Sequence, residues 1–433
     1  MDVSSELKKQ NSRELAVGFD LTDTYSQVSF GFLDSENVET VSTVAGASNY
    51  LIPTALFKRR EVNQWYAGKD AVKNAEEDGF FVDKLISKAI LKEEVSVGDE
   101  TFRPSALIAL FMKRTLSLLN VVAPISKITS FMVTVDALDE NMVNVLTEAV
   151  LSLGLKTENI FFQSHMESFY YYTIFQDKEL WLHDVLLMDF SGDVLKSYRM
   201  ECNNNTTPIV AFIDPMTFTN VKIENAGDLL ADSLEAKSLD NDISQVVTDL
   251  CNSRIFSSIY FIGENFRQDL FPESVKMMCK KGRVFEGNNL YSKGAAYAAR
   301  NKIRSSILSE SHVFLGNDKL KSNVGINVLK HGEPSYLALL NAGVNWFEAK
   351  KECDVIMNLG NKLSFVITPL TGKNPEVVDI TLSDLPKRPS RCSRLHVEVS
   401  MISEAKMQVT VKDLGFGELF PSSNIEWKEV VNV

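Results

Sequence analysis

Two aspartates in this sequence, Asp20 and Asp189, have the surroundings that phosphate and metal chemistry needs. Each ends a short apolar run (residues 15–19 and 185–188) and is followed by small polar residues and a second run (residues 27–33 and 194–201). This pattern predicts a strand, a tight turn and a second strand, with a carboxylate at the end of the first strand. Two such hairpins facing each other can hold the phosphates of a nucleotide, because turn N–H groups donate hydrogen bonds and carboxylates hold Mg²⁺ through water. Strands that end in aspartate are common, so the pair carries the hypothesis and neither hairpin does so alone.

The elements around these hairpins alternate between strands and helices. We expect strands at residues 52–57, 128–135 and 160–162, and helices at 105–119, at 167–175 and ending at Gly154. After the second hairpin, the patterns predict strands at 209–214, 221–223 and 259–262, a helix at 228–249 and a small-residue helix from Ser292. This alternation predicts an α/β domain with a largely buried sheet.

The pattern changes near residue 313. Eight short alternating runs follow, with no long helix, at residues 324–329, 336–340, 355–357, 363–367, 377–382, 395–401, 407–411 and 425–429. They predict a separate all-β sandwich. We therefore expect an α/β domain at 1–312, a linker at 313–320 and a β-sandwich at 321–433. Trp346 and Phe347 are adjacent in this region, so we expect at least one to face outward, where it covers a domain junction or meets a partner.

Composition excludes several classes of function. The 433 residues are 45% hydrophobic and 24% charged, as in a globular protein, and the net charge of −12 disfavours nucleic acid or an anionic membrane as the main partner. The five cysteines are scattered without a CxxC pair, so neither a disulfide framework nor a zinc site is expected. No apolar run is long enough to span a membrane, and the polar residues 1–13 do not resemble a signal peptide, so a cytoplasmic location is expected.

The order of these pieces resembles the Hsp70 chaperone family of the actin-like ATPase superfamily. Residues 18–26 are similar to that family's first phosphate loop, and residues 185–193 stand where its second loop belongs. Residues 262–267 stand where its V-G-G-S-T-R segment belongs, and residues 294–296 match its G-A-A segment. Residues 50–54, 68–71 and 133–155 match further segments, and residues 324–327, 384–389, 395–399 and 409–413 resemble strands of its substrate-binding β-domain. The resemblance implies an actin-like (Hsp70-type) nucleotide-binding fold joined to a β-sandwich that binds a peptide or protein. Two departures are expected: residues 214–259 are too few for the family's full upper lobe, and the resemblance includes no counterpart of its helical lid.

The resemblance also implies a set of site residues, with ATP or ADP and Mg²⁺ as cofactors. Asp20 and Asp189 would order the Mg²⁺ waters, and Asp189 with Lys84 would be catalytic if the site is active. One residue of register decides whether Asp83 or Lys84 takes the lysine position. The nucleotide contacts would come from Asp20, Thr24, Tyr25, Asp189, Gly192, Gly263 and Arg267.

Acidic replacements inside the loops weigh against nucleotide binding. Asp23 replaces a threonine of the family pattern, whereas Ser191, Asp193 and Glu264 replace glycines. A carboxylate about 4 Å from a phosphate charge costs on the order of 4 kcal/mol at an effective dielectric of about 20, roughly a thousandfold in affinity. The alternative is that these acids are solvated turn residues.

The residues for water activation are also largely replaced. Ser164 stands where the family has a glutamate, and the neighbouring His165 is expected to be a packing or solvent residue and not a general base. Efficient ATP hydrolysis is therefore not expected. The first hypothesis is a divergent Hsp70-like binding or scaffold module. The alternatives are a weak ATP-binding chaperone and an actin-like cytoskeletal protein. The sequence leaves the oligomeric state open.

Overall fold

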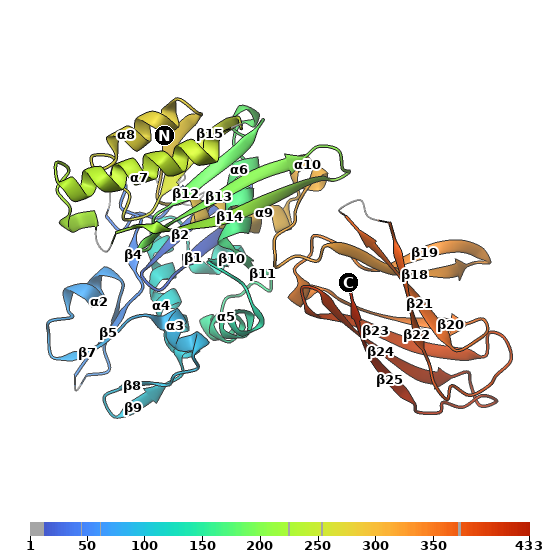
Figure 1. Ribbon diagram of the computed structural model, residues 1–433. Helices are drawn as coiled ribbons and strands as arrows, with labels where there is room; N and C mark the ends of the chain where they lie inside the picture. The colour runs from blue at the N-terminus through green and yellow to red at the C-terminus, as the bar shows by residue number, and fades with distance from the viewer. Residues whose placement is uncertain (1–12, 45, 61, 224–225, 253, 371–373) are drawn as a thin grey trace, which may run out of the picture. The chain divides into compact units, whose positions relative to one another are not determined.

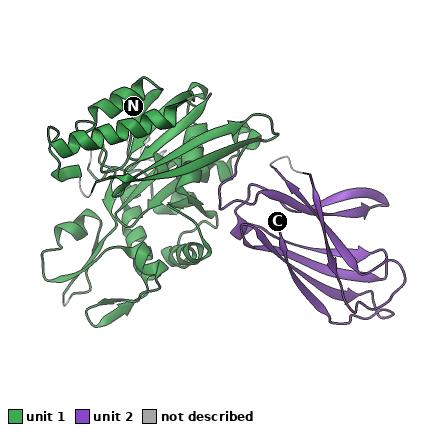
Figure 2. Cartoon of the chain, viewed as in Figure 1, with its two compact units in different colours: residues 1–313 green, residues 314–433 purple. Residues whose placement is uncertain are grey.

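The computed structural model describes residues 13–44, 46–60, 62–223, 226–252, 254–370 and 374–433. The chain divides into two compact units, residues 1–313 and 314–433 (Figure 2). Each unit has its own hydrophobic core, and the candidate site lies within the first.

The first unit is built on two six-stranded sheets that repeat one topology (Figure 1). The first sheet has the order β11-β10-β1-β2-β3, with β4 paired to β2, and the second has the order β16-β15-β12-β13-β14-β17. In each, an antiparallel meander is followed by two parallel strands: β1 pairs with β10 as β12 pairs with β15. This repeat gives β1 and β12 equivalent places, and Asp20 and Asp189 lie at equivalent strand ends.

The strands of the two sheets have the following bounds. The first contains β1 (Leu15–Leu21), β2 (Tyr25–Phe32), β3 (Val38–Thr40), β4 (Ile52–Pro53), β10 (Ile128–Val135) and β11 (Ile160–Ser164). The second contains β12 (Asp184–Asp189), β13 (Val194–Asn203), β14 (Ile209–Lys222), β15 (Phe256–Ile262), β16 (Arg283–Glu286) and β17 (His312–Phe314). Both predicted hairpins are confirmed.

Helices cover these sheets. On one face of the first sheet, α3 (Leu85–Ile90), α4 (Pro104–Leu116) and α5 (Glu140–Leu153) share a core with β1 and β10. The other face packs against α9 (Leu290–Ile303), which also contacts α6 (His165–Ile174). The second sheet shares a core with α7 (Leu234–Cys251) and α8 (Pro272–Cys279).

Small residues permit the closest of these contacts. A Cβ on Gly18 of β1 would lie 2.3 Å from the Ala296 nitrogen of α9, and one on Gly294 of α9 would lie 1.9 Å from the Ser168 carbonyl oxygen of α6. Side chains cannot fit at such distances, so the small-residue helix predicted from Ser292 is what allows α9 to lie directly against β1 and α6.

Smaller elements complete the unit. A three-stranded sheet contains β5 (Leu56–Arg59), β6 (Trp65–Ala67) and β7 (Gly79–Val82), and a hairpin contains β8 (Val95–Val97) and β9 (Glu100–Phe102). Two short helices are α2 (Lys69–Lys73) and α10 (Ile307–Ser311). The 3₁₀ turns are η1 (Ser117–Val121), η2 (Ile125–Lys127), η3 (Lys178–Leu180) and η4 (Ala226–Asp228).

The second unit is all β, as predicted. Its two antiparallel sheets have the orders β19-β18-β21-β22 and β20-β23-β24-β25 and enclose one core. The elements are β18 (Ser322–Lys330), β19 (Glu333–Leu340), η5 (Trp346–Glu348), β20 (Lys350–Met357), β21 (Lys362–Pro369), β22 (Glu376–Thr381), β23 (Ser393–Ser403), β24 (Lys406–Gly415) and β25 (Glu426–Asn432). All eight predicted strands are present.

Three sequence expectations are corrected. The strands predicted at 209–214 and 221–223 form one strand, β14, because residues 215–218 between them, which are mostly exposed, continue the pairing with β13. The helix predicted from residue 228 begins at Leu234, where the Ser233 side chain accepts a hydrogen bond from the Ala236 N–H. Trp346 is buried and Phe347 is half-buried against the same core, so neither faces outward as an exposed aromatic. Among the residues described, no helix is long and apolar enough to cross a membrane.

Candidate functional site

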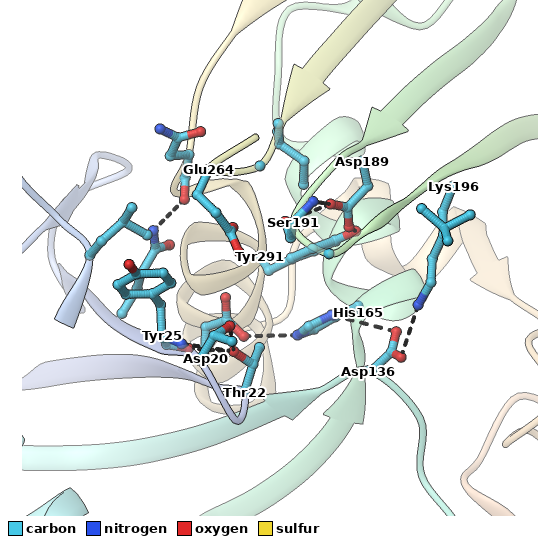
Figure 3. Close-up of a pocket in the computed structure, with 18 residues that line it drawn as sticks. Asp20, Thr22, Tyr25, Asp136, His165, Asp189, Ser191, Lys196, Glu264 and Tyr291 are labelled. Carbon is cyan, nitrogen blue, oxygen red and sulfur yellow. Dashed lines mark hydrogen bonds and ion pairs between the residues drawn. The ribbon is translucent and has the colours of Figure 1, made fainter. Parts of the chain in front are cut away.

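The two hairpins of the first unit border a cavity of about 210 Å³ (Figure 3). The structure brings six of the predicted site residues to its wall, namely Asp20, Thr24, Tyr25, Asp189, Gly192 and Gly263. Lys84 and Arg267, the remaining two, do not line it.

Asp20, at the end of β1, is paired with a histidine. Its Oδ1 lies 2.8 Å from Nε2 of His165, and both side chains are more than nine-tenths buried. On the other side of the ring, Nδ1 of His165 is 4.0 Å from Oδ1 of Asp136, whose Oδ2 lies 3.2 Å from Nζ of Lys196. Figure 3 shows the imidazole between the two carboxylates, with Lys196 reaching Asp136. The Asp20 carboxylate is therefore held by a protein group.

The histidine also connects Asp20 to the second aspartate. The rings of His165 and Tyr291 stack with centroids 4.0 Å apart and an angle of 7° between their planes. The Tyr291 hydroxyl donates to Oδ2 of Asp189 at 2.7 Å. We call this series, Asp20–His165–Tyr291–Asp189, the cleft bridge. It joins the ends of β1 and β12 through side chains that α6 and α9 supply.

Asp189 is satisfied on its other oxygen as well. Its Oδ1 accepts the Ser191 N–H at 2.9 Å and the Ser191 hydroxyl at 2.5 Å. The turn of the first hairpin is similarly closed: Oγ1 of Thr22 accepts the Tyr25 N–H at 3.1 Å and donates to the Tyr25 carbonyl at 2.6 Å. A backbone donor that the resemblance assigns to phosphate is thus already used within the turn.

Burial and neighbouring charges shift three pKa values in the site. Burial disfavours the charged imidazole of His165, but Asp20, Asp136 and Asp189 outweigh it and raise the pKa of the ring. Burial, with the charge of Asp189, raises the pKa of Tyr291 well above its ordinary range, so its hydroxyl remains a donor. Burial, with the charges of Asp189 and Asp193, raises the pKa of Glu264 to about 7.

The acidic replacements have separate fates. Asp23 turns away from the cavity and accepts the backbone N–H groups of Ile86 at 2.8 Å and Ser87 at 3.2 Å, at the start of α3. Asp193 is exposed and does not line the cavity. Glu264 does line it and is partly buried. Only Glu264 therefore places an added acidic side chain in the cavity wall.

Lys84 and Arg267 serve the local backbone. Lys84 is exposed and has φ 50° immediately before α3, so the structure does not bring it to the cavity. Arg267 donates to the carbonyl oxygens of Ala226 at 3.0 Å and Leu229 at 3.4 Å, and pairs with Asp269. Both lie in segments that the resemblance selected, but neither points to the site.

Two bridge residues were not recognised as such in the sequence. His165 was expected to be a packing or solvent residue, and it does pack, but its contact with Asp20 was missed. Tyr291 was not singled out, since a tyrosine before a small-residue helix carries no signal of its own. The sequence predicts the strand at 128–135 that Asp136 follows, but nothing in the sequence places Asp136 near His165.

Comparison with known families gives one match for each part of the chain. Residues 37–317 match the C-terminal region of a family of unknown function, DUF5716. The chain belongs to this family. Residues 319–433 match a domain of unknown function, DUF8552. No curated protein matches the chain.

The site of this DUF5716 chain does not fit a Mg²⁺-nucleotide in the observed arrangement. Its wall carries four carboxyl groups (Asp20, Asp136, Asp189 and Glu264) against one lysine and one histidine, so acidic groups outnumber basic ones where a phosphate would lie. Its volume lies below the roughly 300–1,000 Å³ of typical ligand pockets.

Proposed function

We propose that this chain is a divergent Hsp70-like protein that acts as a peptide- or protein-binding scaffold, with an actin-like first unit whose nucleotide site is degenerate. The observation that carries the proposal is the cleft bridge. Asp20 and Asp189, which would order Mg²⁺ in an active site, are bonded to His165, Tyr291 and Ser191. A protein-made contact thus replaces the ligand-made contact between two equivalent hairpins.

The repeated sheet topology supports the actin-like part of the proposal. An antiparallel meander followed by parallel strands occurs twice, and the two loops after β1 and β12 border one cavity. The two-sheet second unit supports the resemblance to a substrate-binding β-domain. Binding through this unit would need no nucleotide turnover, which agrees with the exposed position of Lys84 outside the cavity wall.

Calorimetric titration with ATP and ADP in Mg²⁺ tests the degenerate site. We expect no heat of binding up to about 1 mM nucleotide, because Glu264 faces the cavity and the aspartates are already bonded. An Asp20→Ala variant serves as the control. Micromolar binding by the native chain that the control loses would overturn the proposal in favour of a weak ATP-binding chaperone, and hydrolysis would then be measured.

A further inference from the structure

The second unit has a groove of its own, separate from the candidate nucleotide site of the first unit. Its volume is about 450 Å³, and every residue in its wall belongs to β22 or β25. These two strands are the outer members of the two sheets, and in the part of the chain that the structure describes each is paired on one side only. The groove is therefore bordered by two rows of backbone N–H and C=O groups that remain available for pairing.

The groove combines an apolar floor with an acidic rim. Ile380 and Val431, both buried, form part of its wall, and Val430 beside them is 55% exposed. The charged residues in the wall are Glu376, Asp379 and Glu429, and no lysine or arginine lines it. Asp379 pairs with Lys362, whereas Glu376 and Glu429 have no ion pair among the described residues. Two unneutralised carboxylates thus flank an apolar strip.

The opposite edge of the sandwich differs in the features that normally prevent strand pairing. There, β19 contains Pro334, and β20 begins with Lys350 and Lys351. Proline and lysine are the usual means of protecting an open edge. In contrast, β22 contains neither, and the single lysine of β25, Lys428, is paired with Glu426 at 3.1 Å. Among the described residues of the sandwich, the β22/β25 edge therefore has no proline within its two strands, and its one lysine is already paired.

We propose that the groove between β22 and β25 is a strand-addition site for an extended, lysine- or arginine-rich segment of a partner protein. Main-chain pairing with an open edge supplies affinity, and alternate side chains supply specificity. The six residues of β22 span about 20 Å, which sets the length of the segment at roughly six residues. Apolar side chains at every second position would meet the floor, and basic side chains would meet Glu376 and Glu429.

Charge also decides against a second copy of this chain as the occupant. Two copies paired through this edge would place the acidic rim of one against that of the other, and like charges across a strand pair are destabilising. The net charge of −12 adds to this repulsion. This proposal rests on the proposed function in one respect, namely that the second unit binds a peptide. It adds that the peptide binds between β22 and β25 and is rich in lysine or arginine.

Fluorescence anisotropy of the full chain with a labelled eight-residue peptide of alternating valine and lysine tests the site. We expect saturable binding that weakens as salt rises, no binding of the valine–glutamate peptide, and loss of binding when alternate peptide nitrogens are methylated. The E376K/E429K variant should bind the basic peptide at least about tenfold more weakly. The matched variant E333K/E352K changes the same charges at the opposite edge and should bind within about twofold of the native chain.

Hydrogen–deuterium exchange places the peptide. Protection of the β22 and β25 amides is expected, and protection elsewhere in residues 314–433 would overturn this groove while leaving a peptide-binding second unit intact. Absence of binding, or equal binding by E376K/E429K, would also overturn it. Sedimentation of the native chain as a dimer, with the β22 and β25 amides protected in the absence of peptide, would identify a second copy as the occupant and overturn the proposal. None of these outcomes depends on the nucleotide titration, so the degenerate-site proposal stands or falls separately.

Discussion

At the scale of the residue, the bonding of Asp20 decides what the cleft can hold. Its carboxylate lies 2.8 Å from His165 inside a buried pair. A buried carboxylate needs a partner, and here the imidazole of His165 fills that role. His165 is thus a structural counter-charge, and its own second neighbour is the carboxylate of Asp136.

Replacement of His165 should reveal this role. His165→Ala leaves Asp20 buried without a partner, so we expect the free energy of unfolding to fall by about 2–4 kcal/mol. The pKa of His165 is raised in the folded state, so its contribution is complete below pH 6.5 and is lost as pH rises through the folded value. The loss in the variant should therefore be larger at pH 6 than at pH 9, as measured by chemical denaturation.

A second histidine provides the matched control. Nδ1 of His396 lies 2.8 Å from Oδ1 of Asp354 in a pair that is partly exposed. His396→Ala should cost less than about 1 kcal/mol. Similar losses for the two variants would contradict the structural role of His165.

Substitution of Glu264, unlike that of His165, should raise the free energy of unfolding. Its folded pKa of about 7 exceeds the ordinary 4.5, so the native chain carries no penalty below pH 4.5 and a growing one as pH rises to 7. Glu264→Gln removes the charge, and after allowance for partial exposure it should stabilise the protein by about 1–2 kcal/mol above pH 7 and by almost nothing at pH 4.5.

Denaturation curves at pH 4.5 and pH 8 measure this difference. Glu286→Gln, at an exposed position in β16, is the control and should change stability at neither pH. If Glu264→Gln stabilises the protein equally at both pH values, ionisation of the Glu264 carboxyl is not the cause of the effect.

The sequence predicts the carboxylates of the site better than their partners. Asp20 and Asp189 follow from local strand-and-turn patterns. In contrast, the stack of His165 on Tyr291 joins the starts of α6 and α9, which are far apart in the chain, and no local pattern encodes their approach. The direction of Asp23 toward α3 is likewise a tertiary outcome, since the same residue in an isolated turn would be solvated.

At the scale of the element, two glycines at the ends of strands differ in whether the packing of the protein requires them. Gly263, after β15, has φ +113°, and a Cβ there would lie 2.2 Å from the Phe190 carbonyl carbon. Gly192, after β12, has open space where a Cβ would be placed. The resemblance gives both glycines to the nucleotide, but only Gly263 is required by the packing of the protein itself.

Alanine at these two positions should therefore act differently. Gly263→Ala combines a steric overlap with backbone strain, so we expect a loss of about 2–4 kcal/mol in unfolding free energy. Gly192→Ala should change it by less than about 0.5 kcal/mol. Thermal and chemical denaturation of the two variants measures this contrast, and comparable stability would mean that the close approach of Gly263 to Phe190 is relieved at little cost.

Element prediction succeeded where one periodicity held throughout. The eight strands of the second unit follow from alternation, because one face of each sheet meets a single core. The prediction divides β14 in two, because the middle of this strand is mostly exposed and is held as strand by pairing with β13. Pairing partners that are distant in sequence are not visible in the pattern of one strand.

At the scale of the whole molecule, the two units respond to opposite ends of the pH range. In the first unit, the pKa values of His165 and Glu264 are both raised, so folding favours the protonated form of each side chain. In the second, Asp413 of β24 is buried and accepts two hydrogen bonds from Arg388 at 2.7 Å, with further bonds from the N–H groups of Gly415 and Ser423. The hydrogen bonds from Arg388 are the main cause that holds the pKa of Asp413 well below its ordinary 3.8, and the backbone donors add to this effect.

Asp413→Asn should destabilise the second unit in a pH-dependent way. The substitution leaves the guanidinium of Arg388 buried without a counter-charge, which costs about 3–5 kcal/mol. Because the pKa of Asp413 is lowered, its contribution is present above pH 3.8 and is lost as pH falls toward the folded value. Hydrogen–deuterium exchange at pH 7 should show lost protection at β23 and β24, while the strands β1 and β12 of the first unit stay protected.

The exposed pair of Asp379 and Lys362, 3.3 Å apart in the same unit, gives the control. Asp379→Asn should cost less than about 1 kcal/mol, and its effect should be confined to β21 and β22. The difference in unfolding free energy between Asp413→Asn and the native chain should be constant from pH 7 to pH 5 and shrink below pH 4. A difference that persists undiminished at pH 2.5 would assign the stabilisation to packing of the side chain and not to its charge.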